Sequence, residues 1–212
     1  MKIEKGDALD LMMKFPHRPN LIATDPPYAF GGSGAEHAIS ATVAIVLREA
    51  AARLADGGWL LIMCASSWRS LAYMAEAVRG LVDPVRVATW TKPTSRTKAR
   101  TPGWAWSSVL VLACRKGKSL IQPSAILDHH EAAPVLNGRR AELPESVADW
   151  VVSPFASPGV FLDPFSGSGA LPKAAERAGM QAFGFEQNPP EEPDLEPEIP
   201  MPLRTAPKRD TV

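Results

Sequence analysis

A carboxylate, two prolines and an aromatic ring follow the apolar run 21–23 and Thr24, as Asp25, Pro26, Pro27 and Tyr28. Proline holds φ near about −65° and has no N–H. A turn of this kind presents the Asp25 carboxylate and the main-chain carbonyls as hydrogen-bond acceptors beside the Tyr28 ring. These acceptors suit a planar group that carries an NH2, such as the amino edge of a nucleobase. An ordinary turn that ends a strand is the alternative, and the four residues alone do not decide between the two.

A glycine-rich turn follows a second apolar run, residues 160–162. The turn comprises Asp163, Pro164, Phe165, Ser166, Gly167, Ser168 and Gly169. Its glycines allow a ligand to approach the backbone closely, and a predicted helix at 171–180 adds free N–H groups at its N-terminus. No lysine follows the last glycine, as a P-loop would require. Ser166 stands where a nucleophile elbow, G-x-S-x-G, has its first glycine, so Ser168 is a poor candidate for a nucleophile.

An acidic residue ends the next predicted strand, Gln181–Glu186. Doubly wound folds hold a ribose hydroxyl with an acid at this position, roughly 20 residues after the glycine turn. Strand, turn, helix, strand and acid together therefore predict an adenosine-containing cofactor.

The two motifs resemble the catalytic and cofactor motifs of S-adenosylmethionine-dependent DNA amino-methyltransferases. Their order along the chain resembles the beta group of that family, and the segment 3–10, with Gly6-Asp7, matches the one that precedes D-P-P-Y there. The resemblance covers roughly residues 1–188. It implies a Rossmann-like α/β fold with helices on both faces of a mostly parallel, seven-stranded sheet whose last strand is antiparallel.

The resemblance also implies which residues form the site. The catalytic set is Asp25, Pro26, Pro27 and Tyr28. The cofactor set is Asp7, Ala8, Asp163, Pro164, Phe165, Ser166, Gly167, Gly169, Glu186 and Gln187. Beta-group enzymes usually have a Lys-Pro pair near the methionine carboxylate. The corresponding segment, 138–146, has none, which leaves Arg140 and Ser146 as candidates for that contact.

An exocyclic amino nitrogen is a poor nucleophile because its lone pair is delocalised into the ring. Hydrogen bonds to the Asp25 carboxylate and the Pro26 carbonyl would favour a more nucleophilic nitrogen, positioned for in-line attack on a sulfonium methyl group. The Asp25 charge would stabilise the positive charge that develops on nitrogen. A base within a duplex must be flipped out to reach such a site. Tyr28 is the expected stacking partner of that base, and Phe30 is a second candidate.

Charge is unevenly distributed along a chain whose net charge is zero. The segment 84–118 has eight basic residues and no acidic one, whereas 188–212 has six acidic and three basic residues. The tail, 189–212, is rich in proline and is predicted to be disordered. The basic run indicates DNA contact, although a solvated face is the simpler alternative. Candidate DNA-binding residues are Phe30, Lys92, Arg96, Lys98, Arg100 and Trp104.

The length of the chain allows one catalytic domain, 1–188, in which the inserts 92–106 and 119–140 would recognise the target. Packing against the sheet is the alternative role for the tryptophans of the first insert. A homodimer is possible by resemblance. Cys64 and Cys114 lie in apolar runs and are predicted to be buried free thiols. No metal site, membrane span or secretory signal is indicated, so a cytoplasmic location is expected.

The alternation of predicted elements supports an α/β fold. Strands are predicted at 2–4, 21–24, 59–65, 85–91, 107–113, 160–162 and 181–186, and helices at 37–55, 67–81, 142–152 and 171–180. The leading hypothesis is a DNA adenine-N6 methyltransferase. Cytosine-N4 methylation, RNA methylation, or a catalytically silent nucleic-acid-binding regulator are the alternatives.

Overall fold

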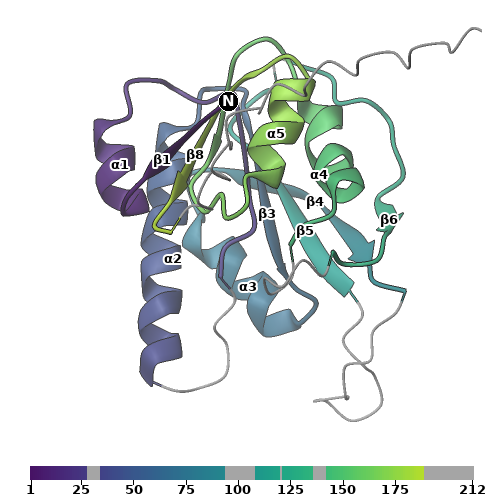
Figure 1. Ribbon diagram of the computed structural model, residues 1–212. Coiled ribbons are helices and arrows are strands. Elements are labelled where there is room, and N and C mark those ends of the chain that lie inside the picture. Colours follow the sequence, from purple (N-terminus) through teal and green to yellow (C-terminus); the bar gives the residue numbers. More distant parts are fainter. Residues whose placement is uncertain (28–33, 94–107, 120, 136–141, 189–212) are drawn as a thin grey trace, which may run out of the picture.

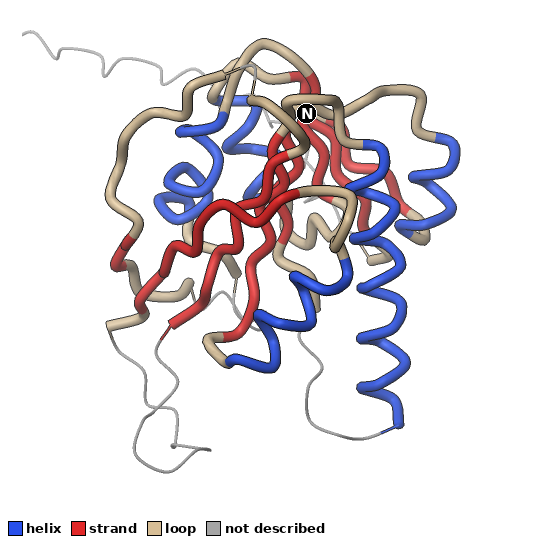
Figure 2. Tube along the Cα trace, turned by 180° about the vertical axis from the view of Figure 1, so that it is seen from behind, coloured by secondary structure: helices blue, strands red, loops and turns tan. Residues whose placement is uncertain are grey.

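The structure is a computed structural model that describes residues 1–27, 34–93, 108–119, 121–135 and 142–188, with the backbone alone for 34–40. The described chain forms one sheet with helices on both of its faces (Figures 1 and 2). The strands are β1 (Lys2–Lys5), β2 (Leu21–Thr24), β3 (Trp59–Ala65), β4 (Asp83–Thr91), β5 (Ser108–Arg115), β6 (His129–Glu131), β7 (Val160–Asp163) and β8 (Gln181–Glu186). The helices are α1 (Ala8–Lys14), α2 (Gly34–Arg53), α3 (Trp68–Ala77), α4 (Glu145–Val152) and α5 (Ala170–Arg177), with a 3-10 turn, η1 (Ser153–Phe155).

The strand order is β1-β8-β7-β2-β3-β5-β4-β6. Every pairing is parallel except those of β5, which runs antiparallel to both β3 and β4. The described sheet thus has eight strands, not the expected seven, because the short strand β6 pairs with the end of β4. The antiparallel strand is the fifth along the chain, whereas the last strand was expected to be antiparallel.

Alternate residues of the central strands pack on opposite faces of the sheet. In β3, Leu60 and Ile62 belong to a core that α1, α2 and α3 cover, whereas Leu61 and Met63 belong to a core that α4 and α5 cover. Because all seven residues of β3 are buried, it shows the continuous apolar run of a strand covered on both faces. Both cysteines are buried and free, as predicted. Burial raises the pKa of Cys64 to about 11 and that of Cys114 to about 12.

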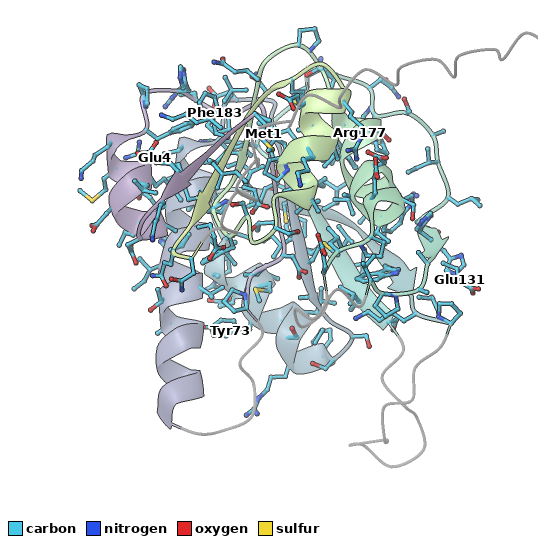
Figure 3. The ribbon with its side chains drawn as sticks, viewed as in Figure 1. Met1, Glu4, Tyr73, Glu131, Arg177 and Phe183 are labelled. Atoms are coloured by element: carbon cyan, nitrogen blue, oxygen red, sulfur yellow. The ribbon has the colours of Figure 1, made fainter. Side chains whose placement is uncertain are left out.

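Ion pairs join the two helices of the second face. Arg177 of α5, labelled in Figure 3, donates to Asp149 of α4 at 2.6 Å and lies 3.2 Å from Glu145.

The helix α4 begins three residues later than predicted. Its N-cap is Pro144, whose carbonyl accepts hydrogen bonds from the N–H groups of Val147 and Ala148.

The helix α1 was not predicted, although Asp7 gives it a regular N-cap. The Asp7 carboxylate accepts hydrogen bonds from the N–H groups of Leu9 at 2.9 Å and Asp10 at 3.3 Å. Met12 is fully buried and attaches this helix to the first core. The capped start of α1 fixes the path of the chain between β1 and β2.

The expected tail, 189–212, lies outside the described residues, and the domain boundary at 188 stays a prediction. Among the described helices, none combines the length and the apolar composition that crossing a bilayer requires. The cytoplasmic location likewise stays a prediction.

Candidate active site and cofactor site

Two neighbouring parallel strands bring the two sequence motifs together. Pairing of β2 with β7 aligns Ile22 with Leu162, so Asp25 leaves the sheet beside Asp163. The Thr24 hydroxyl donates a buried hydrogen bond of 2.7 Å to Asp163 Oδ1. Residues 139 positions apart in sequence thus form one polar contact at the carboxyl edge of the sheet. Ligands of open α/β sheets bind at this edge.

An acidic cavity of about 340 Å³ opens at this edge. Its lining residues are Asp25, Pro26, Pro27, Glu142, Leu143, Asp163, Phe165, Ser166, Gly167, Ser168, Ala170, Leu171, Glu186 and Asn188. Four of these carry a carboxyl group, and none carries a basic one. A positively charged ligand would therefore be favoured in the acidic cavity.

A second cavity, of about 620 Å³, lies between the same edge and α2 and is called the helix-side cavity below. Its lining residues are Gly6, Asp7, Ala8, Asp25, Pro27, Thr42, Val43, Val46, Pro164, Phe165, Gly167, Phe185, Glu186 and Gln187. The two cavities share the lining residues Asp25, Pro27, Phe165, Gly167 and Glu186. Apolar side chains of α2 and β8 make the helix-side cavity suitable for a flat ring, and polar groups lie at the rim of this cavity.

The Glu186 carboxylate holds the glycine turn in place. Its Oε2 accepts a hydrogen bond of 2.9 Å from the N–H of Gly167, and its Oε1 accepts one of 3.0 Å from the N–H of Asn188. Gly167 and Gly169 adopt left-handed backbone conformations, with φ of 51° and 80°. Each oxygen of an ionised carboxylate has more than one acceptor position, so Glu186 can still accept hydrogen bonds from a ligand.

Asp163 is buried at the end of β7, and this environment favours its protonated form. Burial is the largest cause and raises the pKa of this carboxyl from its ordinary value of 3.8 to about 7. Hydrogen bonds from Thr24 and from the N–H of Phe165 act in the opposite direction. The negative charges of Asp25 and Glu186 raise the pKa further. Asp163 therefore titrates near neutral pH in the free protein.

Solved structures with similar folds bear on what this edge does. M1.HpyAVI, solved in complex with S-adenosylmethionine, superposes with a TM-score of 0.71 at 20% identity, covering 88% of this chain and 92% of that one. TTHA0409 of Thermus thermophilus is provisionally assigned as a DNA modification methylase and was also solved with S-adenosyl-L-methionine. It superposes with a TM-score of 0.67 at 24% identity, covering 88% of this chain and 89% of that one. PvuII DNA methyltransferase, which is cytosine-N4-specific, superposes with a TM-score of 0.67 at 15% identity, covering 88% of this chain and 81% of that one. The chain has a Rossmann-like methyltransferase fold. No protein-family model matches it, and no curated protein sequence does.

The methyltransferase fold gathers most of the predicted cofactor residues. Asp163, Phe165, Ser166, Gly167 and Glu186 line the acidic cavity, and Asp7, Ala8, Pro164 and Gln187 line the helix-side cavity. Gln187 donates to Asp7 Oδ2 at 3.3 Å, so the two predicted residues at that rim contact each other. Gly169 begins α5 as its N-cap. The functional roles of all these residues remain predictions.

Most of the predicted DNA-binding residues lie outside the described residues. This applies to Phe30, Arg96, Lys98, Arg100 and Trp104, as well as to Tyr28 of the predicted catalytic set and to Arg140. Lys92 is described, and its ammonium group lies 4.5 Å from the Trp90 ring centre. Burial lowers the Lys92 pKa, and the negative charge of Asp25 opposes that shift. Lys92 is thus within electrostatic reach of Asp25.

The sequence did not single out Glu142 and Leu143, which line the acidic cavity where a Lys-Pro pair was sought. Ser146, a candidate for the carboxylate contact, instead places its hydroxyl 3.3 Å from His130 Nε2. The available signal was the position of Glu142-Leu143-Pro144 at the start of the predicted helix 142–152, since a helix start beside the cofactor strand reaches the same edge. The negative charge of Glu142 is opposite to that of the lysine in the Lys-Pro pair that the resemblance implied.

Replacing Asp163 with asparagine is expected to flatten the dependence of folding stability on pH. The folded-state pKa of about 7 lies above the ordinary 3.8, so the folded state binds this proton more tightly than the unfolded state does. Stability from Asp163 is therefore present at acidic pH and is lost as pH rises through about 4 to 7, by up to about 4 kcal/mol. Urea denaturation between pH 4 and 8 measures this loss in the wild type.

The asparagine variant keeps an oxygen for the Thr24 and Phe165 hydrogen bonds but has no proton to lose. If the free energy of unfolding falls as steeply with pH in Asp163→Asn as in the wild type, another group is responsible for the dependence on pH. Asp10→Asn, at an exposed position of α1, is the control that should leave the dependence of stability on pH unchanged.

Replacing Gly184 with alanine is expected to destabilise the fold and displace the glycine turn. The added Cβ would lie 2.7 Å from Cβ and 2.8 Å from Oγ of Ser166, too close for either atom to remain in place. Overpacking of this kind costs about 1–3 kcal/mol. Thermal denaturation measures the loss. Ser166→Gly removes both close contacts but also loses the hydrogen bond from Ser166 Oγ to the Phe185 carbonyl, so it serves as a second background. If Gly184→Ala costs as much stability in the Ser166→Gly background as in the wild type, the steric explanation is wrong.

Proposed function

We propose that this chain transfers a methyl group from S-adenosylmethionine to the exocyclic amino group of a base in DNA, and that the base is adenine. One observation carries the proposal: Asp25 lines both the acidic cavity and the helix-side cavity. An acceptor at the junction of two cavities can hold an amino group against a ligand that occupies the other side. Solved structures of similar fold were determined with S-adenosylmethionine, which supports this choice of cofactor.

The residues at the edge fit S-adenosylmethionine. When bound, this cofactor supplies an electrophilic methyl group on a sulfonium centre. In the proposed arrangement, the apolar wall formed by Val43, Val46 and Phe185 packs against the adenine ring. Glu186 accepts hydrogen bonds from the ribose hydroxyls. The carboxyl groups of Asp25, Glu142 and Glu186 in the acidic cavity favour the cationic sulfonium and ammonium groups.

The target amino group is held by Asp25 and the Pro26 carbonyl in this proposal. Both accept hydrogen bonds from the NH2, which localises the nitrogen lone pair. As the N–C bond to the methyl group forms and the S–C bond breaks, positive charge develops on nitrogen, and the Asp25 carboxylate stabilises it. The nitrogen then loses a proton to solvent or to Asp25. No covalent enzyme intermediate is required, and the buried Cys64 and Cys114 thiols have no role.

Adenine and cytosine both carry an exocyclic NH2 group that suits the Asp25 acceptor. An Asp followed by Pro-Pro-Tyr resembles adenine-N6 enzymes and also some cytosine-N4 enzymes, and a similarly folded structure is cytosine-N4-specific. The amino acceptors at Asp25 recognise an NH2 group and not the ring that carries it. Cytosine N4 is therefore the second candidate. A flipped-out base and a homodimer belong to the same proposal by resemblance.

The test is transfer of a labelled methyl group into unmethylated duplex DNA, followed by digestion and mass spectrometry of the nucleosides. The expected product is N6-methyldeoxyadenosine. N4-methyldeoxycytidine would correct the base while keeping the reaction. Methyl transfer to RNA alone would correct the substrate, and DNA binding without transfer to any nucleic acid would identify a silent regulator.

A further inference from the structure

Trp68 is the most exposed large apolar side chain in the described part of the chain, with 82% of its surface accessible. It is the first residue of α3, and only Ser66 and Ser67 separate it from the end of β3. An indole exposed to this degree leaves a large apolar surface in water. Arg69, its neighbour, is exposed as well.

The start of α3 is held firmly, so the exposure of Trp68 has a structural cause. The Ser67 hydroxyl caps the helix by accepting a hydrogen bond of 3.1 Å from the N–H of Ser70. Ser70 and Met74 are buried, and they orient the helix face that packs on the sheet. Trp68 and Arg69 precede this buried face and are left on the solvent side.

Register places Trp68 at the same edge as the candidate site. Ala65 of β3 is aligned with Val109 of β5, which in turn is aligned with Trp90 of β4. Trp68 and Lys92 therefore leave the sheet at nearly the same level. In Figure 1, α3 lies at the lower end of the sheet, toward which the parallel strands run.

Electrostatic interactions also connect this level to Asp25. Burial raises the pKa of Cys64, the residue before Ala65, and the negative charge of Asp25 adds to that rise. Burial lowers the pKa of Lys92, and the same charge opposes that shift. The carboxyl edge thus carries Asp25 in its interior, with an exposed indole and two basic side chains beyond it. Aromatic rings among basic groups are the chemistry of a surface that binds nucleic-acid bases and phosphates.

We propose that Trp68 stacks on a base of the bound DNA beside the target nucleotide, with Arg69 against a neighbouring phosphate. This inference rests on the proposed function, because it assigns a DNA contact to the same edge. Extrusion of the target base exposes the faces of its neighbours, and an indole can cover one of them. Trp68 is a positioning residue and does not touch the reacting atoms.

The test compares Trp68→Ala and Trp68→Phe with the wild type and with Met13→Ala. Met13 lies on α1 with 68% of its surface accessible and provides a matched loss of an exposed apolar side chain. A fluorescein-labelled duplex of mixed sequence is titrated at one fixed salt concentration, and methyl transfer is measured over a range of DNA concentrations. We expect Trp68→Ala to raise Kd and the KM for DNA by about tenfold or more. Cofactor affinity and kcat at saturating DNA should be unchanged.

Rescue by the phenyl ring identifies stacking, so Trp68→Phe should recover most of the lost affinity, while Met13→Ala should match the wild type. Wild-type affinity in Trp68→Ala would overturn the inference. Dissociation of a wild-type dimer in Trp68→Ala, seen by sedimentation without a change in DNA affinity, would overturn it too and assign Trp68 to a second copy. A wild type that binds the duplex but methylates nothing would sink the proposed function alone, since the binding arm still tests Trp68.

Discussion

Asp25→Ala is expected to abolish methyl transfer while leaving the affinity for S-adenosylmethionine within a few-fold of the wild type. The variant loses the carboxylate that accepts from the target amino group and stabilises its developing charge. Removing one preorganised group of this kind lowers kcat by about 10²–10³ or more. Single-turnover transfer to DNA measures the first effect, and isothermal titration with the cofactor measures the second.

Asp25→Asn separates charge from shape at the same position. It keeps an acceptor oxygen but loses the negative charge, so most of the loss should persist. Asp10→Asn, at an exposed position of α1, is a control that removes an acid away from both cavities. A loss of cofactor affinity as large as the loss of transfer would place Asp25 in the cofactor site, which is a real alternative because it lines both cavities.

Glu186→Ala is expected to weaken binding of S-adenosylmethionine by about 10- to 100-fold, since hydrogen bonds to charged groups contribute about 1.5–3 kcal/mol each. The variant loses the acceptor for the ribose hydroxyls and also the acceptor for the N–H groups of Gly167 and Asn188. Titration calorimetry with S-adenosylmethionine and with S-adenosylhomocysteine measures the change. Both ligands carry the same ribose, so both should lose affinity to a similar extent.

Glu186→Gln keeps one acceptor oxygen and should bind with intermediate affinity. Glu131→Gln, on the exposed edge strand β6, is the matched control and should bind as the wild type does. Unchanged affinity in Glu186→Ala would show that the ribose lies elsewhere. A loss confined to S-adenosylmethionine would instead mean that Glu186 acts on the sulfonium charge.

Patterns of buried residues made the central strands predictable. The ranges 21–24, 59–65 and 181–186 were predicted as the structure has them, because each apolar run is bounded by turn-forming or polar residues. The strand β6 was not predictable in this way. Its residues, His129, His130 and Glu131, have no strand pattern of their own and become extended by pairing with β4.

The meeting of the two motifs could also be predicted, since parallel strands carry their carboxyl ends to one edge. Contacts that depend on how the chain returns to this edge could not. The hydrogen bond between Thr24 and Asp163 needs the exact alignment of β2 with β7. Glu142 reaches the acidic cavity only through the path of the chain before α4. The hydrogen bond has no local signal in the sequence, and the only signal for Glu142 is its place at the start of the predicted helix 142–152.

Because the proposed cofactor site extends through both cavities and Asp25 lines each of them, the cofactor and the target base cannot bind independently. Whichever ligand binds first changes the space and the charge that the other ligand meets at Asp25. The resulting coupling free energy is reciprocal, so the factor by which cofactor alters affinity for the target must equal the factor by which the target alters affinity for cofactor. The cofactor and the target can then bind in either order, and the total free energy of forming the ternary complex is the same for both orders.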